Sequence, residues 1–221
     1  MTNPYNQKKS TKKLAFNSNI TNILSYLLIY WWQMNFSTLL NTQKTVFTIQ
    51  QIGQILWIKD NNTLRVQLTR RKKNGLMQNL HYGIRSLPHY SRDEVANILK
   101  SPSYISLETV LYQAWITFQY YGNTIFSVSN NTKSFIIQEI NYTYNKIATS
   151  ILLNPKGITY NKWVAFASIE RAICDRLYLT PWHHFDNLRN ISRNKLLEIA
   201  EIYNNKRLIL DITQLKNGIR Y

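Results

Sequence analysis

Hydrophobic and polar positions in the first half of the chain alternate with the period of an α-helix. In residues 49–56, isoleucine and leucine recur at helical spacing. Thr48 precedes them and Gln51 follows it three residues later, which is a capping-box pattern. This pattern predicts a short helix that begins after Thr48 and ends near Trp57-Ile58. A longer apolar stretch upstream predicts another helix, from about residue 21 to residue 40.

A second polar cluster marks the start of a basic helix. Asp60-Asn61-Asn62 has the composition of a turn and a helix N-cap, and the segment TLRVQLTRRKK follows at residues 63–73. Leu64 and Leu68 lie four positions apart, so they are expected to face the core. Gly75 stands just after this helix, where a residue in the left-handed conformation is favoured.

Two short apolar stretches then predict a β-hairpin. They cover residues 76–80 and 84–87, and His81-Tyr82-Gly83 separates them. Of these three, Tyr82 is expected to pack and His81 to be a turn residue. The order helix, helix, turn, basic helix, glycine and hairpin is that of a winged helix-turn-helix, which we expect over residues 20–88.

The second half mixes both kinds of pattern. Ser91, with Glu94 three residues later, is expected to cap a helix, and Ser106 and Ser168 are expected to cap two more. Residues 124–147 alternate apolar and polar side chains, as strands do, and helical patterns return after residue 191. We therefore expect an α+β protein, with the winged helix followed by a mixed α/β domain over residues 89–221.

The charge distribution predicts a binding partner. The chain carries 27 Lys and Arg against 11 Asp and Glu, a net charge of +16. Residues 1–90 hold 12 of these basic residues and a single acid, Asp60. A field of one sign attracts polyanions, which makes double-stranded DNA the expected partner. An anionic membrane surface and a basic surface without any polyanion partner remain open as alternatives.

The basic helix supplies the candidate DNA contacts. The helix face opposite Leu64 and Leu68 carries side chains that are suited to contact base edges. Side chains at the two edges of that face are suited to contact phosphates. Arg85 on the hairpin is a further phosphate candidate. The candidate residues are Asn62, Arg65, Val66, Thr69, Arg70, Arg71, Lys72, Lys73 and Arg85.

Composition also bears on location. Residues 1–19 are polar and basic and are expected to form a flexible arm. Residues 20–34 are the most apolar stretch, but it is shorter than the roughly 20 residues of a membrane span. The single cysteine, Cys174, allows no disulfide within the chain, which favours a reducing compartment, and we expect a cytoplasmic protein.

The sequence offers little for catalysis. The four histidines have no metal-ligand spacing, and Cys174 lies in an apolar stretch where it is expected to be buried. We therefore expect no catalytic residue, no metal and no cofactor. A metal-dependent nuclease is a minor alternative, and its carboxylates would come from Glu108, Glu139, Glu170 and Asp175.

Two segments of the second half resemble a known family. Residues 101–112 (SPSYISLETVLY) and residues 167–179 (ASIERAICDRLYL) are similar to signature helices of AbiEi-type antitoxins. Residues 124–133, a strand followed by Thr132-Lys133, also resemble that family. Arg71, Arg85 and Ala114-Trp115 depart from its pattern.

The resemblance implies a function. It implies an N-terminal winged domain that binds operator DNA and represses its own operon, in a toxin–antitoxin system. It also implies a functional partner, a nucleotidyltransferase-like toxin. The alternative from another class is an interaction module that binds protein or RNA without reading DNA sequence. The oligomeric state stays open between monomer and homodimer.

Overall fold

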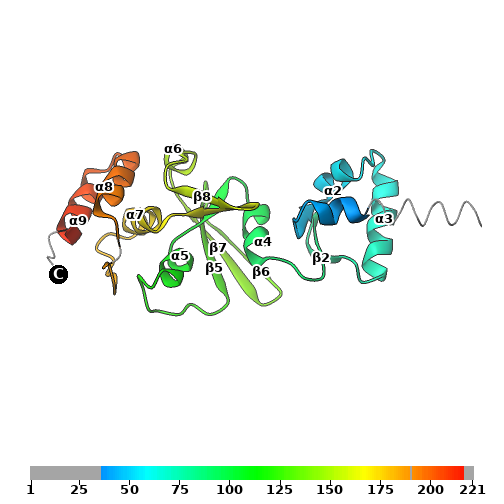
Figure 1. Ribbon diagram of the computed structural model, residues 1–221, viewed down its shortest axis with the longest axis horizontal. Coiled ribbons are helices and arrows are strands. Elements are labelled where there is room, and N and C mark those ends of the chain that lie inside the picture. Colours follow the sequence, from blue (N-terminus) through cyan, green and yellow to red (C-terminus); the bar gives the residue numbers. More distant parts are fainter. Residues whose placement is uncertain (1–35, 190, 217–221) are drawn as a thin grey trace, which may run out of the picture. The chain divides into compact units, whose positions relative to one another are not determined.

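The computed structural model describes residues 36–189 and 191–216, and these residues form a mixed α+β structure with helices and two β-sheets (Figure 1). They divide into two compact units. Of the described residues, one unit comprises 36–44 and 50–67, and the other comprises 45–49, 68–189 and 191–216. The expected basic arm over residues 1–19 and the apolar stretch over residues 20–34 lie outside the described residues.

The first unit contains a pair of helices joined by a short turn. Helix α2 (Ile49–Ile55) lies almost wholly in this unit, and helix α3 (Asn61–Lys73) begins in it. A Cβ atom on Gly53 would lie 3.2 Å from Cδ2 of Leu64, so only a residue without a side chain fits here without displacement. The amide of Ile58 donates to the carbonyl of Gly53 at 2.9 Å and closes the end of α2. Glycine therefore allows the close approach of the two helices.

The second unit begins with a small antiparallel sheet of order β1-β3-β2. The hairpin β2 (Gln78–His81) and β3 (Ile84–Ser86) confirms the predicted one, and Gly83 in its loop has a φ of +76°. The third strand, β1 (Val46–Thr48), was not expected. It ends at Thr48, directly before α2, and pairs with β3 through residues almost 40 positions away.

The larger sheet has six strands in the order β6-β7-β5-β4-β9-β8, with parallel pairing only between β5 and β7 and between β4 and β9. The predicted strands within residues 124–147 are confirmed. The six strands are β4 (Ser103–Ile105), β5 (Thr124–Ser129), β6 (Lys133–Ile137), β7 (Ile140–Lys146), β8 (Ile158–Asn161) and β9 (Val164–Ala167).

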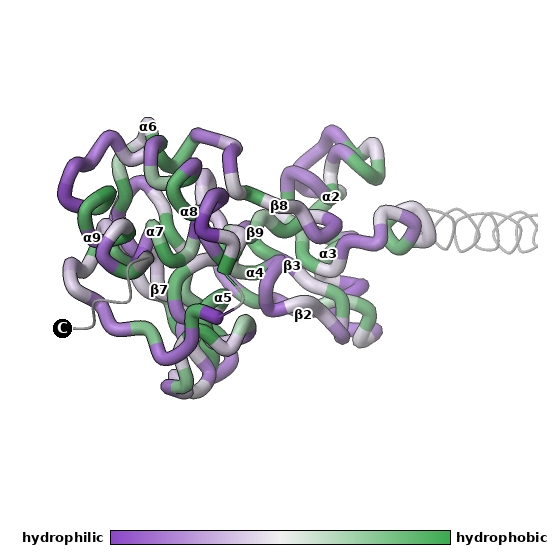
Figure 2. Tube along the Cα trace, turned by 60° about the vertical axis from the view of Figure 1, so that its left-hand side comes forward, coloured by the Kyte–Doolittle hydropathy of each residue, from purple (hydrophilic) through white to green (hydrophobic). Residues whose placement is uncertain are grey.

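Helices occur between and after the strands of the larger sheet in the sequence. They are α4 (Arg92–Leu99), α5 (Glu108–Gln113), α6 (Thr149–Leu152), α7 (Ile169–Leu179), α8 (Arg193–Ala200) and α9 (Lys206–Lys216), with a 3₁₀ turn at Glu201–Tyr203. Hydrophobic residues fill strand β9, whereas they alternate with hydrophilic ones along α8 and α9 (Figure 2). The second half is thus a mixed α/β structure.

One carboxylate ties β1 to α4. Ser91 caps α4 as predicted, because its hydroxyl accepts from the amide of Glu94 at 3.4 Å. The Glu94 side chain does not complete the capping box. Its Oε2 instead accepts from the backbone amides of Thr45 at 2.7 Å and Val46 at 2.9 Å. The buried acid therefore satisfies the amides of the first residue of β1 and of the residue before it, almost 50 positions upstream.

A fully buried polar cluster joins β4 to α7. Asp175 accepts from Ser106 Oγ at 2.7 Å, from Tyr203 Oη at 2.5 Å and from Tyr104 Oη at 3.1 Å. Arg171, one turn earlier on α7, lies 3.7 Å from the same carboxylate. Burial raises the pKa of the Asp175 carboxyl, and Arg171 together with the three hydroxyl donors opposes that rise.

Arg171 is held from several sides. Its Nε donates to Tyr104 Oη at 3.2 Å, and its terminal nitrogens donate to the carbonyls of Lys156 at 2.7 Å and Ile151 at 2.6 Å. A buried guanidinium costs free energy unless it is hydrogen-bonded in this way. The hydrogen bonds of the cluster link Asp175 and Arg171 to β4, to the 3₁₀ turn and to residues near α6, so we interpret the cluster as structural.

The start of α5 differs from expectation. The prediction that Ser106 caps this helix is wrong, because the N-cap residue is Leu107 and the Ser106 hydroxyl is directed at Asp175. Leu107 is buried with a φ of +56°, a conformation unusual for a branched side chain. The next residue, Glu108, pairs with Arg176 of α7 at 3.0 Å. Contacts with α7 thus hold the residues on both sides of the strained position.

Candidate nucleic-acid interface

Helix α3 has well-defined ends. At its start, Oδ2 of Asp60 accepts from the amide of Thr63 at 2.6 Å, which confirms the predicted cap. Hydrogen bonds from Thr63 hold the pKa of the Asp60 carboxyl below its ordinary value. At its end, Gly75 has a φ of +69°, and the amide of Leu76 donates to the carbonyl of Arg71 at 2.9 Å. The end at Lys73 matches the prediction, whereas the helix begins at Asn61, two residues before the predicted start at Thr63.

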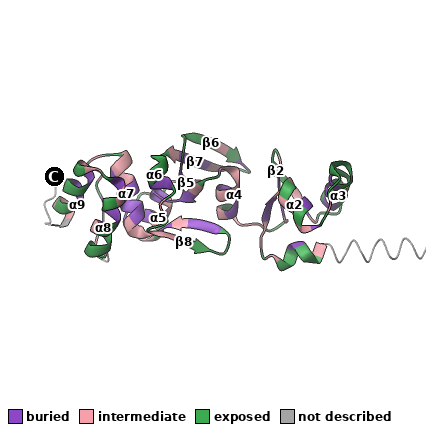
Figure 3. Ribbon diagram, turned by 90° about the horizontal axis from the view of Figure 1, so that it is seen from above, coloured by how far each residue is buried: buried purple, intermediate pink, exposed green. Residues whose placement is uncertain are grey.

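The two faces of α3 differ in burial. Leu64 and Leu68 are buried, as predicted. Most of the rest of the helix is exposed (Figure 3). The exposed candidates are Asn62, Arg65, Val66, Thr69, Arg70, Lys72 and Lys73. Since all of them belong to one continuous helix, their relative positions follow from helical geometry.

Arg71 requires a correction. It was expected on a flank of the helix as a phosphate contact, but its side chain is only 1% exposed. Burial lowers the pKa of its guanidinium. Arg71 is seven residues after Leu64 and three after Leu68, so it belongs to the same buried stripe. That spacing was the signal in the sequence, and the long charged side chain concealed it.

Arg85 is less accessible than expected. It lies on β3, the central strand of the small sheet, and its side chain is half-buried. Its Nη1 donates to the carbonyl of Ile84 at 3.0 Å, and burial lowers the pKa of its guanidinium. It is therefore a weaker phosphate candidate than the lysines of α3.

The tip of the hairpin also departs from expectation. Tyr82 is 96% exposed, so the prediction that it packs is wrong. The exposed ring stands on a two-residue loop with Gly83, and the neighbouring His81 contacts the ring of Phe135 edge to face at 5.6 Å. An exposed aromatic side chain at a hairpin tip is available for contact with a partner.

The local charge is uniform. Residues 61–92 contain seven Lys and Arg and no Asp or Glu. The seven are Arg65, Arg70, Arg71, Lys72, Lys73, Arg85 and Arg92. With Arg71 buried and Arg85 half-buried, the exposed positive charge of this segment is concentrated on α3 and at Arg92. No acid of the segment neutralises it.

The carboxylates of the nuclease alternative are not assembled for metal binding. Across residues 36–189 and 191–216, no three or more His, Cys, Asp or Glu side chains are grouped so that they could hold a metal ion. Asp175 and Glu108 are both buried, the first in the hydroxyl cluster and the second beside Arg176.

The single cysteine of the chain lies in the core. Cys174 is buried, as predicted, and burial raises its thiol pKa well above the ordinary value. A thiol in that state is a weak nucleophile at neutral pH.

Among the helices that the structure describes, none has the length and apolar character needed to cross a membrane.

Comparison with protein-family models gives no match, and comparison with curated proteins gives none either.

Proposed function

We propose that the chain is a DNA-binding regulator and that α3 enters the major groove of double-stranded DNA. The observation that carries this proposal is the division of α3 into a buried stripe and an exposed basic face, in a segment without acids. The major groove is wide enough for one α-helix, and it presents a distinct pattern of donors and acceptors for each base pair.

The exposed face provides two kinds of contact. Arg65 and Arg70 are suited to bidentate hydrogen bonds with guanine, and Val66 and Thr69 to apolar contact with a thymine methyl group. Lys72 and Lys73, in the last turn, are suited to phosphates. The proposed interface thus combines sequence reading with non-specific electrostatic attraction.

We propose further that the DNA-binding part of the chain is a winged helix-turn-helix. Helices α2 and α3, joined by a short turn, supply the helix-turn-helix, and the β2–β3 hairpin with exposed Tyr82 supplies the wing. The role of autorepressor and antitoxin, with a toxin as functional partner, is supported only by the resemblance of residues 101–112 and 167–179.

A binding experiment tests the proposal. The full chain is titrated against the DNA upstream of its own gene and against a scrambled duplex, across a series of salt concentrations. The variants are Arg65→Ala and Arg70→Ala, and Arg189→Ala is the matched control because it removes the same charge from an exposed position outside α3. Retained folding of each variant is checked by circular dichroism.

The outcomes are distinct. We expect the native duplex to bind roughly 100-fold or more tightly than the scrambled one, within the usual range of specificity ratios. Arg65→Ala and Arg70→Ala should erase most of that margin, and Arg189→Ala should keep it. Equal affinity for both duplexes would overturn sequence-specific reading by α3.

A second candidate function is an interaction module for protein or RNA. The loop between α5 and β5 exposes Trp115 (66%), Phe118 (59%) and Tyr120 (69%), and no charged residue occurs between positions 109 and 132. Asp186 holds the loop, because its Oδ2 accepts from the amide of Phe118 at 2.7 Å. Exposed aromatic side chains are enriched at interfaces, so this surface favours the alternative if both duplexes bind equally.

A further inference from the structure

A small apolar pocket lies between α8, α9 and the segment that precedes α8. Its lining consists of Leu188, Ile191, Arg193, Leu196, Leu197, Ile212 and Leu215, and its volume is about 50 Å³. Six of these seven residues are leucine or isoleucine. The pocket walls therefore provide apolar contact and, apart from Arg193, no charged or hydrogen-bonding side chain.

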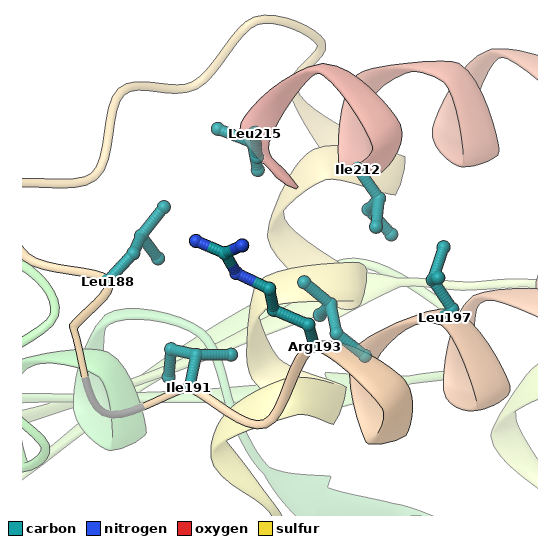
Figure 4. Close-up of a pocket in the computed structure, with 7 residues that line it drawn as sticks. Leu188, Ile191, Arg193, Leu197, Ile212 and Leu215 are labelled. Carbon is teal, nitrogen blue, oxygen red and sulfur yellow. The ribbon is translucent and has the colours of Figure 1, made fainter. Parts of the chain in front are cut away.

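Arg193 is the exception. Its guanidinium extends into the space between Leu188 and Leu215 (Figure 4). Within the part of the chain that the structure describes, no hydrogen bond or ion pair engages this side chain. Arg193 is an exposed residue, so an anionic ligand from solvent can reach its guanidinium at the mouth of the pocket.

The acids of the two neighbouring helices pair with other basic residues. On α8, Glu198 pairs with Lys156 at 2.9 Å, and on α9, Asp211 pairs with Arg207 at 3.7 Å. No aspartate or glutamate is among the lining residues. The charge of the pocket is thus positive and complementary to an anion supplied from outside.

We propose that this pocket binds a short aliphatic carboxylate. The carboxylate pairs with the guanidinium of Arg193, whose planar fork matches two carboxylate oxygens, and the alkyl chain contacts the leucine and isoleucine side chains. One water needs about 10–15 Å³ of such space, so the pocket accommodates an alkyl group of about three to five carbon atoms. A branched acid such as 4-methylpentanoate has the required shape and charge.

The proposal stands apart from DNA binding by α3. Its residues all come from the segment 188–215, and its test measures ligand binding without any nucleic acid. Loss of DNA binding in an α3 variant therefore leaves it unaffected, and failure of ligand binding leaves the DNA proposal unaffected.

Calorimetric titration of the full chain with 4-methylpentanoate tests the proposal, and the uncharged 4-methylpentanol serves as the matched probe. A ligand of this size is expected to bind with a dissociation constant of about 1 mM or below. Arg193→Gln should weaken binding by about tenfold or more, the usual effect of losing a hydrogen bond to a charged group. Arg189→Gln, at an exposed position outside the lining, should leave the affinity unchanged.

A second variant probes the apolar wall. Leu197→Trp places a larger side chain in the pocket and should abolish binding while Arg193 is retained. Resonance shifts in an NMR titration should be confined to residues of α8, α9 and the preceding segment. Absence of saturable binding at about 10 mM acid, equal binding of the alcohol, or equal loss in Arg189→Gln overturns the proposal.

Discussion

The hydroxyl of Ser106 donates a 2.7 Å hydrogen bond to Oδ2 of Asp175, and the two residues are 69 positions apart in the chain. Tyr104 and Tyr203 direct their hydroxyls at Oδ1 of the same carboxylate. Asp175 therefore connects the end of β4, helix α7 and the 3₁₀ turn after α8. Its removal affects three elements at once.

Asp175→Asn should destabilise the protein strongly. The amide keeps the size of the side chain but removes the charge that compensates Arg171, and it replaces an acceptor with a donor. Breaking a buried ion pair on one side costs about 3–5 kcal/mol. Urea unfolding measures the loss, and Glu170→Gln on the same helix is the control, with an expected change below about 1 kcal/mol. Similar losses in both variants would contradict a special role for the cluster.

Glu94→Gln should loosen β1. The carboxylate accepts from two backbone amides, and a neutral amide side chain is a weaker acceptor for both. We expect a loss of about 1–3 kcal/mol and faster hydrogen exchange at the amides of Thr45 and Val46. Asp93→Asn, in the same turn of α4, is the control. Unchanged exchange at these two amides would show that the contact contributes little.

Asp60 should make the start of α3 sensitive to pH. Its folded-state pKa is lowered by Thr63, so its contribution to stability is present above the unfolded pKa and is lost as pH falls through the folded pKa. An NMR titration should show the carboxyl and the Thr63 amide changing together at acidic pH. Asp60→Asn keeps a capping acceptor without a titrating group, so its Thr63 amide should not respond. A response in that variant would assign the effect to another group.

Gly53→Val should separate the helix pair of the first unit. A Cβ atom at this position already lies 3.2 Å from Leu64 and 3.3 Å from the carbonyl of Ile58, and valine adds two methyl groups. Overpacking of this kind costs about 1–3 kcal/mol. Thermal unfolding measures the change. Gln54→Val, at an exposed position of the same helix, controls for the lower helix propensity of valine and should have a smaller effect.

The salt dependence of DNA binding should distinguish Lys72 from Arg71. Lys72→Ala removes an exposed charge and should reduce the log–log salt slope by about 0.9, the value for one phosphate contact on duplex DNA. Arg71→Met should leave the slope unchanged, because the buried side chain does not reach a phosphate. A reduced slope for Arg71→Met, with the fold retained, would show that Arg71 reaches the DNA.

Local sequence determined the elements that depend on local contacts. The cap at Asp60, the left-handed Gly75, the β2–β3 hairpin and the cap at Ser91 all involve residues a few positions apart, so each could be predicted from spacing. The burial of Leu64 and Leu68 and the exposure of Arg65 and Arg70 followed from helical periodicity in the same way.

Tertiary structure determined the hydrogen-bond partners and the burial of several polar side chains. Glu94 has the spacing of a capping box, yet it binds the amides of β1, and Ser106 has the spacing of a cap, yet it binds Asp175. Arg71 has the charge of a surface residue and lies in a buried stripe. For Glu94 and Ser106, the local pattern offers one hydrogen-bond partner, and folding brings another from 48 and 69 positions away. For Arg71, folding removes water from the side chain. Only the arrangement of strands and helices fixes which alternative has the lower free energy.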